Sequence, residues 1–244
     1  MDGMEAEHGL SLYIEALGRR ILFDMGQTDM FYRNALRLGI DPGAADLAVI
    51  SHGHYDHGGG LEKFLEINKT APVYIHNAAF LPHYNGFDKY IGLDTACRDS
   101  SRIVFTSENT AVGNGLTLYA PGKEDIGKVP FCGLYEKTDR GFVQDDFCHE
   151  QYLMIEENGK RVLFSGCSHR GAVNIIRQYD PDVFVGGLHF SKLSEGELDD
   201  EAAKMKKFKA VYHTCHCTGL EQYEQLKGAL DRISYLSAGT QITI

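Results

Sequence analysis

Short runs of apolar and β-branched residues, separated by glycines and charged positions, recur along the chain and predict strands. In the first half they cover Leu12–Glu15, Arg20–Asp24, Leu47–Ser51, Val73–His76, Ile103–Thr106 and Leu116–Tyr119. In the second half they cover Tyr152–Glu156, Val162–Ser165, Val183–Val185, Ala210–Thr214 and Ile233–Leu236. The stretch "EALGRRILF" turns at Gly18. It predicts a hairpin, and we expect the early strands to form an antiparallel ladder.

Helical periodicity falls between other strands, at Met30–Leu38, Leu61–Asn68, Ala172–Tyr179, Glu197–Phe208 and Leu220–Leu230. Strand–helix–strand units follow one another in the second half, which favours an α/β fold with mixed sheets. The segments 84–102 and 122–144 show no regular pattern, and we expect loops over a site there. No repeat or linker divides the chain, so we predict a single domain over residues 1–244.

Composition narrows the function classes. Hydrophobic residues make up 43% and charged residues 24% of the 244 positions, as in globular proteins. Acidic residues outnumber basic ones 34 to 24, giving a formal charge of −10. This argues against nucleic acid as the main partner, because phosphate binding needs clustered Lys and Arg. We expect a small-molecule substrate, and the oligomeric state is not readable.

The sequence contains no apolar run of the roughly 20 residues that span a bilayer. The first residues, "MDGMEAEHGLSLYIEA", lack the basic and apolar parts of a signal peptide. We therefore expect a cytoplasmic protein without a membrane partner, in which the six cysteines are reduced.

The stretch "SHGHYDHGGG", residues 51–60, holds three of the 11 histidines of the chain within six positions. It follows a buried-strand pattern, so an extended backbone would project positions 52, 54 and 56 from one face. The three glycines then permit a turn that brings back His57. Imidazole and carboxylate together are ligands for a metal such as zinc. The alternative, a histidine-rich surface turn, is disfavoured by this density.

These residues also carry a family resemblance. "SHGHYDHGGG" resembles the His-x-His-x-Asp-His motif of the metallo-β-lactamase-fold superfamily, and "ILFDMG" resembles its first motif. With "EHGLSLYIE", "FSGCSHRGAVNII", "GGLHF" and "CHCTG", the chain looks like a subgroup similar to an archaeal dihydropterin ribofuranosyl-aminobenzene phosphate synthase. Members usually have a further strand before "EHGLS", which we do not expect in this chain. The resemblance implies a four-layer αββα sandwich with two mixed sheets.

The resemblance also implies a site for one or two divalent ions. His52 and His54 would bind one ion, and Asp56 and His57 the other. His169 and His216 would complete the two ligand sets. Zinc is favoured, with iron and manganese left open. Where most dinuclear members have a bridging aspartate, this chain has Cys167, which we place at or near the site.

Other histidines and one aspartate compete for roles. His149 precedes a strand where other members keep a metal ligand, and it is the alternative to His169. Asp24 is expected to orient a ligand histidine. His189 is a candidate for orienting substrate or donating a proton, or for a structural role. His8, His76 and His83 are expected to be structural or to lie at the rim.

We predict a hydrolase that acts through metal-bound hydroxide on a phosphorylated or phosphodiester small molecule, with a pterin-related compound as one candidate substrate. Asp56 and His189 are its candidate catalytic residues. The second hypothesis is a metal-binding thiol or redox sensor, suggested by Cys167, Cys215 and Cys217. A separate zinc knuckle at residues 213–219 is disfavoured, because no second cysteine pair accompanies it.

Overall fold

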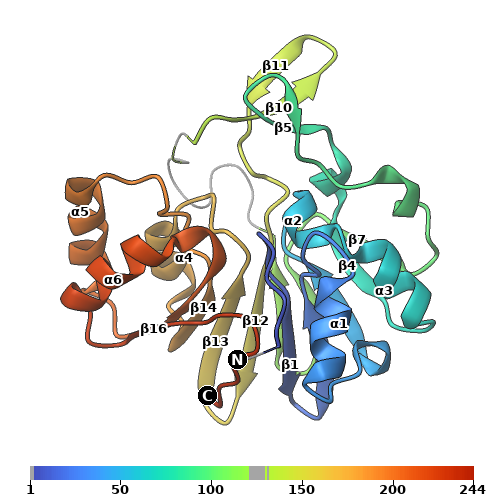
Figure 1. Ribbon diagram of the computed structural model, residues 1–244, viewed down its shortest axis with the longest axis horizontal. Coiled ribbons are helices and arrows are strands. Elements are labelled where there is room, and N and C mark those ends of the chain that lie inside the picture. The colour runs from blue at the N-terminus through green and yellow to red at the C-terminus, as the bar shows by residue number, and fades with distance from the viewer. Residues whose placement is uncertain (1–2, 121–129, 131) are drawn as a thin grey trace.

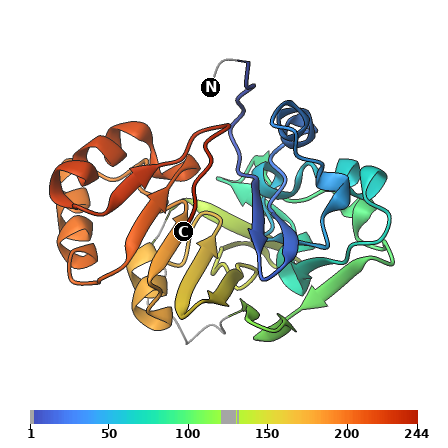
Figure 2. The ribbon, with the colours of Figure 1, turned by 90° about the horizontal axis from the view of Figure 1, so that it is seen from below.

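The computed structural model describes residues 3–120, 130 and 132–244. Two sheets lie face to face at the centre of the molecule, and helices cover the outer face of each (Figure 1). The view from below shows the same order of layers (Figure 2). This is the αββα sandwich that the family resemblance implied, with mixed strand directions in both sheets. No helix among the described residues is long and apolar enough to cross a membrane.

The first sheet has the strand order β1-β2-β3-β4-β7. Its strands are β1 (Leu12–Ala16), β2 (Arg19–Phe23), β3 (Leu47–Ile50), β4 (Val73–His76) and β7 (Ile103–Thr106). Only the β1–β2 hairpin is antiparallel, and the later pairs are parallel. The expected antiparallel ladder is therefore wrong beyond β2. Helices α1 (Met30–Arg37) and α3 (Leu61–Ile67) form crossovers, which return the chain to the same edge of the sheet.

The second sheet has the order β16-β15-β14-β13-β12-β9-β8. Its strands are β8 (Thr110–Gly113), β9 (Leu116–Tyr119), β12 (Tyr152–Glu157), β13 (Lys160–Ser165), β14 (Val183–Gly186), β15 (Val211–Thr214) and β16 (Ile233–Tyr235). From β13 to β16 the pairs are parallel, because α4 (Ala172–Tyr179), α5 (Glu195–Met205) and α6 (Leu220–Ala229) provide the crossovers.

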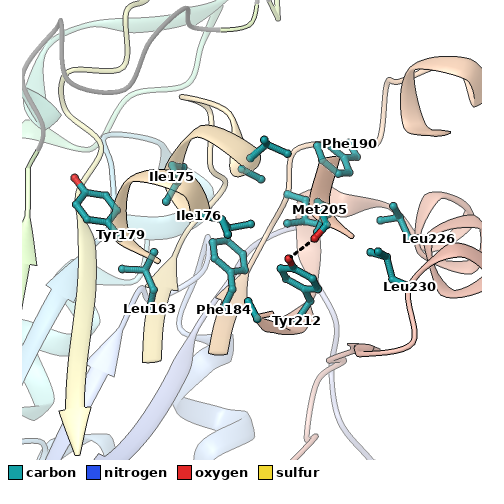
Figure 3. Packing of buried hydrophobic residues seen from close by; sticks show 14 of the residues in the cluster. Leu163, Ile175, Ile176, Tyr179, Phe184, Phe190, Met205, Tyr212, Leu226 and Leu230 are labelled. Carbon is teal, nitrogen blue, oxygen red and sulfur yellow. Dashed lines mark hydrogen bonds between the residues drawn. The ribbon is translucent and has the colours of Figure 1, made fainter. Parts of the chain in front are cut away.

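Three apolar clusters hold these layers together. Between the sheets, Phe23 and Val49 of the first pack against Leu153 and Phe164 of the second. On the outer face of the second sheet, α4 presents the buried positions 172, 173, 175, 176 and 179, the spacing of one helix face. These side chains meet the strands and the other helices in Figure 3, where the Tyr212 hydroxyl donates to the Met205 carbonyl at 3.0 Å. A third cluster joins the first sheet to α1 and α3.

The segments expected to be irregular contain strands where the structure describes them. β5 (His83–Asn85), β6 (Lys89–Tyr90), β10 (Leu134–Thr138) and β11 (Gly141–Gln144) form a small antiparallel sheet, ordered β11-β10-β5-β6, at the top of Figure 1. These strands are short and pair with partners distant in sequence, so local periodicity does not predict them. Residues 122–129 and 131 of the second segment lie outside the described residues.

Candidate metal centre

The residues of the predicted site gather at one edge of the two sheets, beyond the carboxyl ends of their parallel strands. Asp24 follows β2, the stretch from His52 follows β3, and Cys167 and His169 follow β13. His189 follows β14 and His216 follows β15. This edge is where α/β sheets commonly place their sites, because the connecting loops converge there.

The histidine-rich stretch folds differently from the expected extended alternation. His54 is extended, but helix α2 (Tyr55–Gly58) begins immediately after it, so Asp56 and His57 project from a helical turn. Gly59 has φ near −63°, a helical conformation that any residue can adopt, so the backbone dihedrals do not require glycine there. A Cβ on Gly59 would lie 2.2 Å from the Gln27 carbonyl oxygen, and one on Gly53 would lie 2.3 Å from that of Ala79. The glycines therefore allow close backbone packing.

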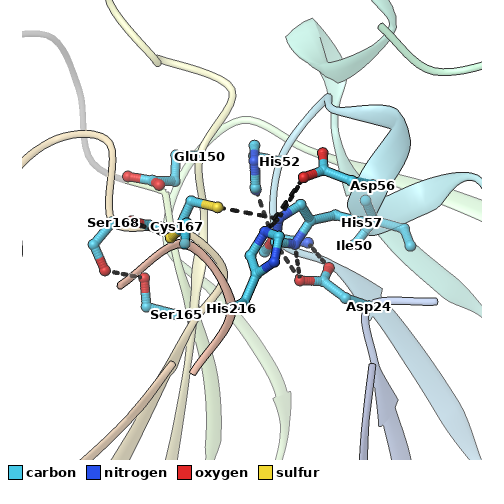
Figure 4. A network of polar contacts seen from close by, with 12 residues as sticks. Asp24, Ile50, His52, Asp56, His57, Glu150, Ser165, Cys167, Ser168 and His216 are labelled. Carbon is cyan, nitrogen blue, oxygen red and sulfur yellow. Dashed lines mark hydrogen bonds and ion pairs between the residues drawn. The ribbon is translucent and has the colours of Figure 1, made fainter. Parts of the chain in front are cut away.

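Asp24 organises two of the predicted ligands from below (Figure 4). Its backbone has a left-handed φ of 59°, so the predicted strand ends one residue earlier, at Phe23. The turn brings its carboxylate to the Ser51 backbone N–H at 2.7 Å and the Ser51 hydroxyl at 2.8 Å. The same carboxylate lies 2.7 Å from His57 Nδ1. This is the geometry of an orienting carboxylate.

This network determines which ring nitrogen of His52 and of His57 is available to bind a metal ion. The Ser51 hydroxyl donates to Asp24, so His52 Nδ1, 2.8 Å from that hydroxyl, carries the proton between them. His57 Nδ1 likewise faces a carboxylate. In both rings the Nε2 lone pair is therefore directed away from Asp24, into the site. A metal-binding histidine is commonly held in this way.

A first group of potential ligands consists of His52 and His169 with Cys167, and the His54 ring adjoins it, with its centroid 4.5 Å from that of His52 and 4.9 Å from that of His169. His54 also forms a close group of potential ligands with Asp145 and His149. His52 Nε2, His54 Nε2 and both ring nitrogens of His169 are buried, and none has a hydrogen-bond partner among the described residues. Ligand atoms of His52, Cys167 and His169 lie within 4.8 Å of one another. Burial lowers the pKa of all three imidazoles well below its usual value, which leaves them in the neutral form that binds metals.

A second group consists of Asp56, His57 and His216, again with Cys167 (Figure 4). His57 Nε2 lies 3.1 Å from Cys167 Sγ, 3.2 Å from His216 Nε2 and 3.8 Å from Asp56 Oδ2. The distance between His216 Nε2 and Asp56 Oδ2 is 3.3 Å. Burial opposes ionisation, but His57 and His216 hold the pKa of Asp56 below its usual value. Despite burial, Asp24 and Asp56 raise the pKa of His57 to about 9, so a cation would bind Nε2 by displacing the proton that this nitrogen carries in the metal-free protein.

The residues present fit a divalent cation in both groups. Buried lone pairs with no donor are costly, and a metal ion would satisfy them. Tetrahedral zinc, with bonds of about 2.0–2.3 Å, spaces its ligand atoms by roughly 3.3–3.8 Å. The spacings in the second group run from 3.1 to 3.8 Å. Cys167 belongs to both groups, so its thiol lies where a bridging ligand would be.

His149, the alternative to His169, is held by other partners. Its Nδ1 accepts the Gly53 N–H at 3.0 Å, which leaves Nε2 to donate to Asp145 Oδ2 at 3.3 Å. The same carboxylate lies 2.9 Å from His83 Nδ1. Both His149 nitrogens therefore have hydrogen-bond partners in the protein, whereas neither nitrogen of His169 has one among the described residues. His76 Nδ1 accepts the Ala78 N–H at 3.2 Å, beside the first turn after β4.

The loop that carries His169 is fixed by a buried glutamate, Glu150. Its carboxylate accepts the backbone N–H groups of His169 at 2.8 Å and Arg170 at 3.2 Å, and the Tyr152 hydroxyl at 2.6 Å. Burial raises the pKa of Glu150 above its usual value. Nothing in the sequence pattern singled this residue out. The available signal was a charged position two residues before β12, whose first four residues are apolar.

His189 lies between the first group and a cavity of about 400 Å³. Its ring centroid is 4.3 Å from that of His169, and burial together with Lys192 lowers its pKa to about 4. The cavity is also lined by the first turn of α4, by Phe190 and by charged residues of both signs on α4 and α5. Cys132 forms a further close group with His169 and His189, and sequence reasoning did not find it.

Of the two further cysteines named by the sensor and knuckle hypotheses, Cys217 lies beside the shared thiol, with its Sγ 3.6 Å from the Cys167 carbonyl oxygen. Cys215 and Cys217 are buried, and neither belongs to a cluster of three potential ligands in the part of the chain that the structure describes. Burial raises the pKa of the Cys215 and Cys167 thiols well above its usual value. Protonated buried thiols react slowly, so Cys215 and Cys167 give the sensor hypothesis no support.

Comparison with known proteins agrees with this fold. Residues 5–212 match the model of the metallo-beta-lactamase superfamily, and the chain belongs to that family. The solved structure of Tm1679, a metal-dependent hydrolase of the beta-lactamase superfamily, is similar to this protein over 100% of this chain and 94% of the Tm1679 chain. It is 30% identical in sequence, with a TM-score of 0.85.

Two curated relatives come from Methanocaldococcus jannaschii. One is an uncharacterized protein, 29% identical over 91% of this chain and 88% of its own length. The other is 7,8-dihydropterin-6-methyl-4-(beta-D-ribofuranosyl)-aminobenzene-5′-phosphate synthase, 26% identical over 88% of this chain and 82% of its own length. The subgroup resemblance read from the motifs is thus found again in whole-chain similarity.

Proposed function

We propose that this protein is a metal-dependent hydrolase that acts on a phosphorylated or phosphodiester small molecule. The observation that carries the proposal is the pair of ligand groups that share Cys167, with buried imidazole nitrogens that lack partners. Membership of a superfamily with a hydrolase-type fold supports it. The named archaeal relative is a synthase whose product carries a phosphate, which supports a phosphorylated and pterin-related substrate.

In this proposal each group has a defined task. His52, His54 and His169 would hold one ion, Asp56, His57 and His216 would hold the other, and Cys167 belongs to both groups. A divalent ion supplies Lewis acidity and lowers the pKa of coordinated water to about 7. Asp24 and Ser51 keep the ligand rings oriented, and Glu150 holds the His169 loop.

The cavity beside His189 is the proposed place for the substrate. The first turn of α4 lines it, and the helix has no side-chain cap there, so its backbone N–H groups suit a phosphate oxygen. Arg177 of the same helix and Lys204 of α5 bring positive charge to this cavity, while three carboxylates of α5 line its other side, so the phosphate is placed at the α4 turn. The neutral His189 ring can hydrogen-bond to the leaving group. A cytoplasmic location stays a prediction.

The test is metal analysis followed by a screen of cyclic phosphodiesters and phosphomonoesters. We expect turnover by the metal-loaded protein and its loss in His54→Ala. His213→Gln is a control, because that imidazole pairs with Ser234 and belongs to neither group. We also expect Asp56→Ala to lower the metal stoichiometry while leaving the fold intact. Full metal occupancy without turnover on any phosphate ester would overturn the proposal.

A further inference from the structure

One histidine outside the two ligand groups lies directly against the second of them. His8 Nε2 is 3.4 Å from Asp56 Oδ2, and its ring centroid is 4.5 Å from that of His216. The His8 side chain is 67% exposed, whereas those of Asp56 and His216 are 13% and 2% exposed. His8, Asp56 and His216 offer ligand atoms within 4.8 Å of one another. His8 therefore covers the solvent side of the second group.

The backbone on both sides of His8 is fixed to the loops that build the site. The Glu7 carboxylate accepts the Gln27 N–H at 2.9 Å and the Thr28 hydroxyl at 2.8 Å. On the other side, Leu10 donates its N–H to the carbonyl of Asp56 itself, at 3.2 Å. These contacts hold the segment around His8 in register with the residue that its ring faces.

Gly9 shows how closely this segment approaches the site. A Cβ at Gly9 would lie 2.7 Å from the Asp56 carbonyl oxygen and 3.2 Å from the Gly26 Cα. Glu5 lies two residues before Glu7. Its carboxylate pairs with Arg33 at 2.7 Å and with Arg37 at 2.6 Å, both on α1. The segment from Glu5 to Leu10 is thus anchored at both ends, and the exposed ring is presented from a fixed backbone.

We propose that His8 is a further protein ligand of the second metal position, bound through Nε2 on the side that faces solvent. The inference rests on the proposed function, since it requires an ion held by Asp56, His57 and His216. With the shared Cys167 these residues would supply four ligands, and zinc can expand its coordination to five, which leaves one place for His8. An exposed imidazole can leave that place more readily than a buried one. His8 would therefore occupy the outward position in the absence of substrate and release it when substrate enters.

A plain structural role is the alternative, in which His8 only packs on His216 and pairs with Asp56. Two variants separate the explanations. His8→Phe keeps an aromatic ring against His216 but has no ligand atom, and His8→Ala removes both the ring and the ligand. The readout is the dissociation constant of each equivalent of Zn²⁺, measured by competition with a chromophoric chelator. Thermal unfolding of the metal-free proteins serves as the control for folding.

We expect both variants to bind the second equivalent at least about tenfold more weakly and the first equivalent unchanged, in line with the loss of a group that supports a metal site. We also expect added imidazole to restore binding in His8→Ala, where it has space, but not in His8→Phe. Unchanged binding in His8→Phe, equal weakening of both equivalents, or a protein that binds only one ion would each overturn the inference. A protein that binds no ion would instead overturn the proposed function.

Discussion

The substitution Glu150→Gln tests whether a buried carboxylate holds the His169 loop in place. Glu150 is fully buried and accepts two backbone N–H groups, from His169 and Arg170, together with the Tyr152 hydroxyl. Gln keeps the size of the side chain and one carbonyl oxygen, but it replaces the other oxygen with an amide donor. At least one of these donors then lacks an acceptor.

The size of the effect follows from these contacts. A hydrogen bond to a charged group contributes about 1.5–3 kcal/mol. We therefore expect the free energy of unfolding to fall by about 2 kcal/mol. For a chain of this length each kcal/mol lowers the melting temperature by about 2–4 °C, so the expected decrease is roughly 4–8 °C. Because the loop carries His169, we also expect the affinity for the first ion to fall about tenfold to hundredfold.

The assay is calorimetric unfolding of the metal-free protein, followed by chelator competition. Glu156→Gln on β12 is the matched control. Glu156 pairs with Arg161 at 3.1 Å at the surface, where such ion pairs contribute only about 0–1 kcal/mol. A melting temperature and metal affinity for Glu150→Gln no lower than those of the control would refute the role assigned to this residue.

Three further predictions address packing, metal and pH. Gly53→Ala places a Cβ 2.3 Å from the Ala79 carbonyl oxygen, so we expect a loss of about 1–3 kcal/mol in denaturant unfolding. Gly228→Ala, within α6 and with nothing within 4 Å, should instead gain about 0.5–1 kcal/mol, and equal effects would contradict the packing argument. Zn²⁺ at 100 times its dissociation constant should stabilise the protein by about 2.7 kcal/mol, seen as a higher melting temperature that a chelator removes. An unchanged melting temperature would count against a metal site formed by the folded chain. Hydrogen bonds from two arginines of α1 lower the pKa of Glu5 from 4.5 to about 2, so its contribution to stability is full above pH 4.5 and is lost as the pH falls towards 2. The difference in melting temperature between wild type and Glu5→Gln should therefore shrink over that range, and a difference that grows there would contradict the assignment.

The sequence alone determined the elements with strong periodicity and the identity of the central motif. The predicted strands at Val73–His76, Ile103–Thr106 and Leu116–Tyr119 and the helix at Ala172–Tyr179 have the predicted bounds in the structure. Their apolar residues repeat at the period of the element, which is a local property. The density of ligand side chains between Ser51 and Gly60 is also local, and it pointed to the superfamily without any knowledge of the fold.

Only the tertiary structure decided which groups face one another. The choice between His169 and His149 depends on Gly53 and Asp145, which are far from one another in sequence. Sequence reasoning also missed the buried carboxylate of Glu150 and the approach of His8 to Asp56. The Glu150 carboxylate is buried, and the nitrogens of His169 are left without a donor, because segments from both sheets meet at the same edge. Burial and pairing of polar atoms are therefore properties of the assembled fold, because each depends on partners that the local pattern does not contain.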